Sequence, residues 1–204
     1  MSESYKTISK PSDVFLFKEK KSKFLGHAFP ISSKESFNRE IQKLKAQYSN
    51  ANHFCYAWRI GIDQPTFITN DDGEPNNTAG VPIYGQIQSF ELTNIAVVVV
   101  RIFGGVKLGT GGLMSSYKAA AKGALTQSNI ITTTVKEYYT ISFPYAKMHA
   151  VIRMINEEKA QILSQDIDNN CNVKVATSKT NASRFEEKLS EARFCIFEKD
   201  QTKN

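Results

Sequence analysis

One segment of the sequence combines glycines and basic side chains in a pattern suited to binding phosphate. An apolar stretch, Ile95–Phe103, leads into a glycine-rich loop and then into an expected helix, Leu113–Gln127. Glycine lets backbone N–H groups approach a ligand closely, and the N-terminus of a helix carries about half a positive charge. The candidate anion-binding or nucleic-acid-binding residues are Arg101, Gly104, Gly105, Lys107, Gly109, Thr110, Gly111, Gly112, Lys118 and Lys122.

Two well-known nucleotide-binding loops do not fit this segment. A Walker A loop needs Gly-Lys-Ser or Gly-Lys-Thr, which the chain lacks, and a dinucleotide fingerprint needs a glycine where Met114 stands. Glycines also serve tight turns and the close packing of a helix on a strand. The segment is therefore open to two interpretations, an anion site or a set of packing glycines.

A polar loop earlier in the chain carries three carboxylates, Asp71, Asp72 and Glu74. Neighbouring carboxylates can transfer protons or hold a hard cation through oxygen ligands. Their spacing is not that of an EF-hand, and Asp-Gly followed by proline is also ordinary turn chemistry. We expect a turn first, a polar contact to a ligand second and a catalytic pair last.

The histidines and cysteines do not form a recognisable metal or nucleophile motif. His27, His53 and His149 are scattered, and no spacing typical of zinc ligands occurs. Cys55 would share a strand face with His53, but no third group that could orient the pair is evident. The sequence therefore predicts no metal, no cofactor and no catalytic residue, and structural roles for these side chains.

The elements that must position these residues begin with a domain over residues 1–135. Ile95–Phe103 is apolar without alternation, which predicts a strand buried on both faces. Ser32 and Glu35 form a capping-box pattern at the start of an amphipathic helix. The expected strands are Asp13–Phe17, Phe24–Phe29, Phe54–Ile60, Thr66–Thr69, Ile95–Phe103 and Ile130–Val135, and the expected helices are Ser32–Tyr48, Val81–Gln88 and Leu113–Gln127.

Residues 136–204 have the periodicity of a second, smaller domain. The expected elements are the strand Tyr138–Phe143, the helix Tyr145–Lys159, the strands Ala160–Ile167 and Cys171–Ala176, the helix Asn181–Ala192 and the strand Arg193–Phe197. Their β-α-β-β-α-β order is that of a ferredoxin-like sheet with two helices on one face. We therefore expect an α+β protein of two domains that divide near Thr134–Glu137.

Composition excludes several classes of protein. The chain is 41% hydrophobic and 23% charged, which is typical of a globular protein. Its densest apolar run, Ile95–Val100, is far shorter than the roughly 20 residues of a membrane span. The polar start of the chain does not resemble a secretory signal, and three distant cysteines are typical of a reducing compartment. We expect a cytoplasmic protein without a membrane partner.

The positive charge is concentrated in the first domain. Residues 1–135 hold fifteen Lys and Arg against ten Asp and Glu, whereas residues 136–204 hold eleven against ten. The segment Leu92–Lys136 has no acidic residue. A continuous positive field favours anionic partners such as nucleic acid, although a solvated basic surface would give the same count.

Three stretches together resemble the YigZ/IMPACT family: Ala51–Trp58, Asp71–Pro75 with Thr78–Gly80, and Val100–Leu113. The resemblance implies an IMPACT-type N-terminal domain shaped like the second domain of a small-subunit ribosomal protein. It also implies a C-terminal domain similar to the ferredoxin-like domains of elongation factor G. The sequence departs from the family pattern at Asn76-Asn77, where Ser-Gly is usual, and at Ile102, where an aromatic residue is usual.

The resemblance also implies a link to translation. Eukaryotic relatives regulate initiation through the amino-acid starvation kinase pathway with an additional N-terminal domain. We do not expect that role here, because the first strand is expected within about a dozen residues of the start. We expect instead a regulatory protein that binds RNA, the ribosome or another translation-related partner through the basic glycine-rich surface.

Two alternatives remain at this stage. One is a hydrolase that acts on an anionic substrate through Asp71, Asp72 or Glu74, and the other is a module that binds an acidic protein. The absence of an RNP-type aromatic motif argues against specific reading of bases. Proximity of the carboxylate loop to the glycine loop would favour the hydrolase, and separation would favour the binding protein, which the sequence by itself favours over an enzyme.

Overall fold

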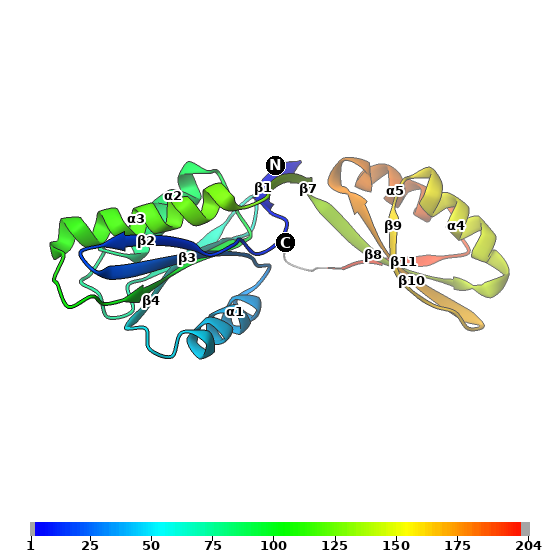
Figure 1. Ribbon diagram of the computed structural model, residues 1–204. Coiled ribbons are helices and arrows are strands. Elements are labelled where there is room, and N and C mark those ends of the chain that lie inside the picture. Colours follow the sequence, from blue (N-terminus) through cyan, green and yellow to red (C-terminus); the bar gives the residue numbers. More distant parts are fainter. Residues whose placement is uncertain (1–2, 201–204) are drawn as a thin grey trace. The chain divides into compact units, whose positions relative to one another are not determined.

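The computed structural model describes residues 3–200, which fold into two compact units (Figure 1). One unit comprises Tyr5–Thr133, and the other is formed mainly by the chain from Thr134 onward. The elements as far as β7 are β1 (Ser4–Ile8), β2 (Phe15–Glu19), β3 (Ser22–Pro30), α1 (Lys34–Gln47), β4 (His53–Ile60), β5 (Thr66–Asn70), α2 (Gly80–Ser89), β6 (Ile95–Ile102), α3 (Gly109–Gln127) and β7 (Ile130–Thr134).

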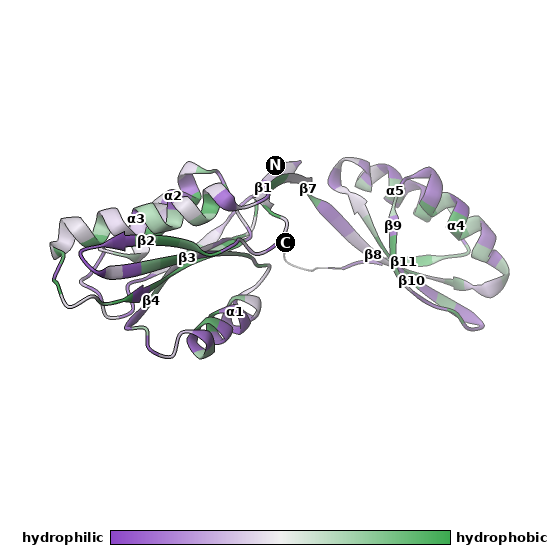
Figure 2. Ribbon diagram, viewed as in Figure 1, coloured by the Kyte–Doolittle hydropathy of each residue, from purple (hydrophilic) through white to green (hydrophobic). Residues whose placement is uncertain are grey.

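A five-stranded antiparallel sheet forms the centre of the first unit, in the order β2-β3-β6-β4-β5. Its middle strand, β6, is buried from Ile95 to Arg101, so the prediction of a strand buried on both faces is confirmed. Helices α2 and α3 pack on one face of this sheet and α1 packs on the other (Figure 1). Many residues within β3 and β4 are hydrophobic, whereas most residues of α1 are hydrophilic (Figure 2).

The N-cap of helix α1 lies one residue later than the sequence pattern predicts. Its N-cap is Ser33, and the reciprocal partner is Ser36, so the predicted pairing of Ser32 with Glu35 is wrong. The Ser33 hydroxyl accepts a hydrogen bond from the Ser36 amide at 3.2 Å, and the Ser36 hydroxyl accepts one from the Ser33 amide at 3.1 Å. Adjacent serines precede the same apolar stripe, so the pattern alone could not separate them.

Strand β1 was not expected from the sequence, because its residues are mostly polar. It pairs with β7 in a separate two-stranded sheet. Only Thr7 and Ile8 of β1 are buried, which leaves little apolar alternation to detect. The pairing of strands so distant in the sequence comes from the tertiary fold.

The second unit contains β8 (Lys136–Pro144), a 3-10 turn η1 (Tyr145–Lys147), α4 (Met148–Glu157), β9 (Gln161–Asp166), β10 (Asn170–Ser178), α5 (Lys179–Glu191) and β11 (Ile196–Lys199). Its antiparallel sheet has the order β11-β8-β10-β9, and one apolar cluster joins this sheet to both helices. The expected β-α-β-β-α-β order and the two-domain α+β class are confirmed. No helix within residues 3–200 has the length and apolarity that a membrane crossing requires.

Candidate functional site

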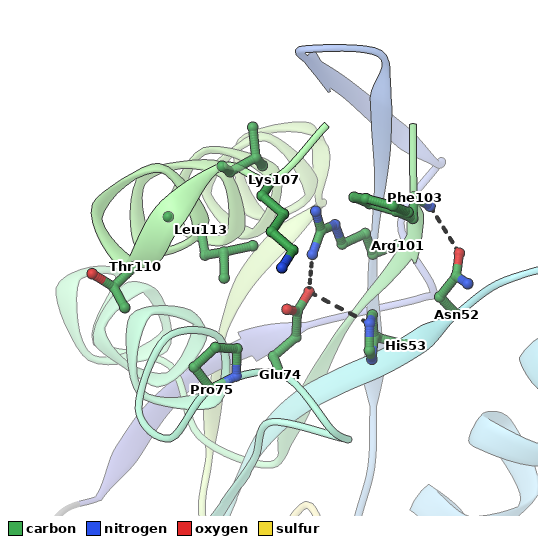
Figure 3. Close-up of a pocket in the computed structure, with 11 residues that line it drawn as sticks. Asn52, His53, Glu74, Pro75, Arg101, Phe103, Lys107, Thr110 and Leu113 are labelled. Carbon is green, nitrogen blue, oxygen red and sulfur yellow. Dashed lines mark hydrogen bonds and ion pairs between the residues drawn. The ribbon is translucent and has the colours of Figure 1, made fainter. Parts of the chain in front are cut away.

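A cavity of about 460 Å³ opens in the first unit beside β4, β6 and the beginning of α3 (Figure 3). Its volume lies within the range of small-molecule sites. The lining combines charged and polar groups with proline, leucine and phenylalanine side chains. The lining residues are Asn52, His53, Glu74, Pro75, Arg101, Phe103, Lys107, Leu108, Gly109, Thr110 and Leu113.

A buried ion pair between Glu74 and Arg101 forms the floor of this cavity. Arg101 Nη1 donates to Glu74 Oε1 at 2.6 Å, and the Arg101 and Glu74 side chains are only 5% and 4% exposed respectively. The Tyr117 hydroxyl donates to the same Glu74 oxygen at 2.7 Å. Burying a charge costs free energy unless the charge is paired and hydrogen-bonded. Here the two opposite charges compensate each other.

Aromatic rings and a serine hold the Arg101 guanidinium in place. Its central carbon lies 5.3 Å from the ring centroids of both Phe24 and Phe103, within the range of cation–π contacts. Arg101 Nη2 also lies 3.4 Å from the Ser22 hydroxyl. These contacts, with the ion pair to Glu74, make Arg101 a fixed part of the floor.

Beneath the floor, Cys55 and Tyr117 extend the polar network into the core. The Cys55 thiol lies 3.3 Å from the Tyr117 hydroxyl oxygen and 3.0 Å from the Asp71 carbonyl oxygen. Burial raises the pKa of the Cys55 thiol and of the Tyr117 phenol far above their ordinary values. Both groups therefore stay protonated at neutral pH, and Cys55 is a hydrogen-bond donor without the thiolate character of a nucleophile.

His53 faces the cavity in a defined orientation. Its Nδ1 lies 2.8 Å from the Asp72 carbonyl oxygen, which can only accept a hydrogen bond, so Nδ1 carries a proton. The other ring nitrogen, Nε2, lies 4.0 Å from Glu74 Oε1 (Figure 3). The structural role expected for His53 is thus incomplete, because the ring also lines the cavity.

Two of the three carboxylates in the polar loop bind backbone amides. Asp71 Oδ1 accepts from the amides of Ala79 and Gly80, each at 2.9 Å, and thereby caps the start of α2. Asp72 Oδ2 accepts from the Phe54 amide at 2.6 Å. The expected turn is present, and these bonds fix the loop that presents Glu74. Among residues 3–200, no cluster of three potential ligand side chains is arranged to hold a metal.

The departure from the family pattern in this loop has a conformational explanation. Asn77 has a φ of 64°, in the left-handed region where glycine is usual. Asparagine tolerates this conformation better than most other residues. The Asn77 amide donates to Asp71 Oδ2 at 2.8 Å, so the substituted residue still supports the loop.

The glycine-rich segment is partly helical, which corrects the expected loop over residues 104–112. Helix α3 begins at Gly109, so its first turn includes Thr110 and the two glycines that follow. No side chain caps this helix, and its first turn has no acidic residue. The four consecutive residues from Gly109 resemble a loop in the sequence because glycine has a low helix propensity. Packing of α3 on the sheet overrides that preference.

The glycines of this segment have different roles. A Cβ at Gly104 would lie 2.1 Å from the Lys21 carbonyl carbon, so this position requires glycine for packing. Gly105 and Gly109 have φ values of 84° and 72°, which side chains rarely adopt. Gly111 has open space around it, and Gly112 approaches the Leu108 side chain. The packing interpretation is therefore correct for Gly104.

The basic residues of the predicted anion site do not all meet. Lys107 lines the cavity, and Figure 3 shows its side chain extending toward Glu74 and Arg101. Lys118 and Lys122 are exposed along α3 and do not line it. Sequence reasoning did not include Asn52 or Phe103 in the site. Asn52 Oδ1 accepts from the Phe103 amide at 2.8 Å and ties the two cavity walls together.

Comparison with known proteins identifies the family. Residues 20–125 match the Impact N-terminal domain. IMPACT family member YvyE of Bacillus subtilis (strain 168) is 32% identical over 195 residues, which cover 94% of this chain and 88% of YvyE. The chain belongs to the YigZ/IMPACT family. IMPACT family member YigZ of Escherichia coli (strain K12) is 30% identical over 84% of this chain and 85% of its own length.

A solved structure extends the likeness of this IMPACT family protein to both units. The crystal structure of a hypothetical protein superimposes with a TM-score of 0.74 and 28% sequence identity, and the match covers 97% of each chain. Within this chain, the three stretches that carry the family resemblance converge on the cavity. They supply Asn52 and His53, then Glu74, and finally Arg101 and Lys107.

Proposed function

We propose that this protein is a cytoplasmic, translation-associated regulator that binds RNA through the cavity at the start of α3. The observation that carries the proposal is the joint presence of Lys107 and the uncapped first turn of α3 in one cavity. Free amides and the dipole of a helix N-terminus favour negative charge, and Lys107 adds a full positive charge beside them. Family membership and a C-terminal unit with the element order of a ferredoxin-like domain support the link to translation.

RNA suits this cavity better than an acidic protein does. The Phe103 side chain is 43% exposed at the cavity wall, and its backbone and ring are held by Asn52 and Arg101. An exposed aromatic ring beside a positive groove is the common arrangement for stacking single-stranded bases. Acidic side chains of a protein partner would use the charge of Lys107 but would leave this ring without a stacking partner.

The hydrolase hypothesis gains support from one observation. Glu74 and Lys107 line the same cavity, and this proximity is the feature expected to favour an enzyme acting on an anionic substrate. Asp71 and Asp72 are bound to backbone amides, so Glu74 is the carboxylate available to a ligand. Sustained release of phosphate from RNA or a nucleotide by the wild-type protein, lost in Glu74→Gln, would establish this second candidate.

Fluorescence anisotropy with a labelled single-stranded RNA tests the binding proposal. We expect Lys107→Ala to weaken binding and to make the log–log salt dependence shallower by about 0.7, because one phosphate contact is lost. Lys118→Ala, on α3 outside the cavity, is the matched control, and we expect it to bind like wild type. Equal losses in the two variants would indicate diffuse charge rather than a site. Failure of the wild-type protein to bind would refute the proposed function.

A further inference from the structure

One carboxylate oxygen on the cavity floor lacks a hydrogen-bond donor. Arg101 and Tyr117 both donate to Glu74 Oε1, whereas Glu74 Oε2 accepts no hydrogen bond from the part of the chain the structure describes. The side chain is only 4% exposed, and Figure 3 shows this second oxygen turned away from Arg101 and His53. This second oxygen is an acceptor available to the cavity, so the floor is complementary to a ligand that donates hydrogen bonds.

His53 gives the floor a second acceptor. Because Nδ1–H donates a hydrogen bond to the Asp72 carbonyl oxygen, the lone pair of this tautomer is on Nε2. This nitrogen lies 4.0 Å from Glu74 Oε1, so the two acceptors are neighbours. Hydroxyl groups can donate to both, whereas a phosphate placed here would meet a carboxylate of the same charge.

The part of the cavity formed by residues 107–110 has the opposite chemistry. Lys107, Thr110 and the first-turn amides of α3 offer hydrogen-bond donors and positive charge. A matching ligand therefore has neighbouring hydroxyls at one end and a phosphate at the other. A ribonucleotide with a 5′-phosphate and free 2′- and 3′-hydroxyls has this arrangement, and the 2′-hydroxyl distinguishes RNA from DNA.

We propose that the cavity binds the 3′-terminal nucleotide of an RNA strand. The hydroxyls of the terminal ribose donate to Glu74 and His53, its 5′-side phosphate lies at Lys107 and α3, and its base stacks on Phe103. Only the last nucleotide of a strand has both hydroxyls free, because every internal 3′-oxygen is esterified. This inference rests on the proposed function and specifies which part of the RNA is recognised.

Four oligonucleotides of one sequence, each labelled at the 5′ end, test this inference by anisotropy. They differ only at the 3′ end, which is an unmodified ribose, a 2′-deoxyribose, a 2′,3′-dideoxyribose or a 3′-phosphorylated ribose. We expect the unmodified RNA to bind at least about tenfold more tightly than the dideoxy and 3′-phosphorylated forms, because each of these leaves the floor acceptors unpaired or brings a like charge to them. The 2′-deoxy form should lie between these extremes.

Two variants separate recognition of the strand end from general RNA binding. Glu74→Gln replaces an acceptor by a donor, so we expect it to lose the preference for the unmodified end. Lys107→Ala should weaken binding of all four oligonucleotides by similar factors. Because Glu74 belongs to a buried ion pair, the fluorescence of Trp58 reports whether Glu74→Gln is folded, and the comparison of oligonucleotides with wild-type protein needs no variant.

The outcomes distinguish this inference from the proposed function. Equal binding of the four oligonucleotides, with a loss in Lys107→Ala, would overturn recognition of the strand end and leave RNA binding intact. No binding of any oligonucleotide would overturn both. A preference for the unmodified end that Glu74→Gln abolishes would support both.

Discussion

Replacement of Arg101 by methionine is expected to destabilise the first unit strongly, because it removes the charge that compensates buried Glu74. The two side chains are 5% and 4% exposed and share a 2.6 Å contact. Removing one partner of such a buried pair typically costs about 3 to 5 kcal/mol. Tyr117 would still donate to Glu74 Oε1, which places the expected loss near about 3 kcal/mol.

The single tryptophan makes the measurement specific to one unit. Trp58 is 7% exposed in the core of the first unit, so its fluorescence during urea denaturation reports the unfolding of that unit. Lys43→Met is the matched control, because Lys43 is 70% exposed on α1 and its ion pair with Glu40 lies at the surface. We expect the control to change the free energy of unfolding by less than about 0.5 kcal/mol.

A double variant tests the physical reason for the loss. In Glu74→Met/Arg101→Met no charge is left uncompensated, and apolar replacements of buried ion pairs are often close to neutral. We therefore expect the double variant to be more stable than Arg101→Met alone. A loss below about 1 kcal/mol in Arg101→Met, or a double variant less stable than the single one, would refute the assignment of a compensated buried charge.

Four further predictions concern packing, protonation, domain structure and metal dependence. Gly26→Ala should destabilise the first unit by about 1 to 3 kcal/mol, because its Cβ would lie 2.3 Å from the Ala120 carbonyl oxygen, whereas Gly85→Ala in open space should not destabilise it in the same denaturation assay. Burial lowers the pKa of His27 to about 4. The free energy of unfolding should therefore decrease as the pH falls from about 6.5 toward 4, because the histidine of the unfolded chain binds a proton in this range and the buried one does not. His27→Phe should reduce this pH dependence in denaturation curves. A fragment of residues 5–133 should fold alone, with a cooperative Trp58 transition, and a featureless fluorescence curve would contradict this. Thermal melts with and without a chelator should superimpose, and a lower melting temperature with chelator would reveal a missed metal site.

Most helices and strands could be predicted from the sequence, because the buried residues of an element are apolar and recur at the spacing of that element. The apolar run of β6 indicated a central strand, and the apolar stripe of α1 indicated a helix. Signals at element ends were less decisive. Adjacent serines left the cap of α1 ambiguous by one residue, and consecutive glycines concealed the first turn of α3. At these ends, packing rather than local propensity decides the boundary.

The candidate site was predicted only in part, because polar contacts between distant residues leave no periodic signal. Arg101 and Lys107 were predicted together in one anion site, but the sequence left open whether Glu74 lies beside them. Lys118 and Lys122, which share a helix with the site, lie outside the cavity. His53 was expected to be structural, since an isolated histidine at the start of a strand has no distinguishing pattern.

The sequence by itself determined the family, the order of elements from β2 onward and the concentration of positive charge in the first unit. The tertiary structure decided which polar groups meet. Glu74 reaches Arg101 across 27 residues and Tyr117 across 43, and these contacts depend on the placement of β6 and on the packing of α3 against the sheet. Hydrophobic burial is encoded residue by residue, whereas the pairing of buried charges is fixed only when the chain has brought distant segments together.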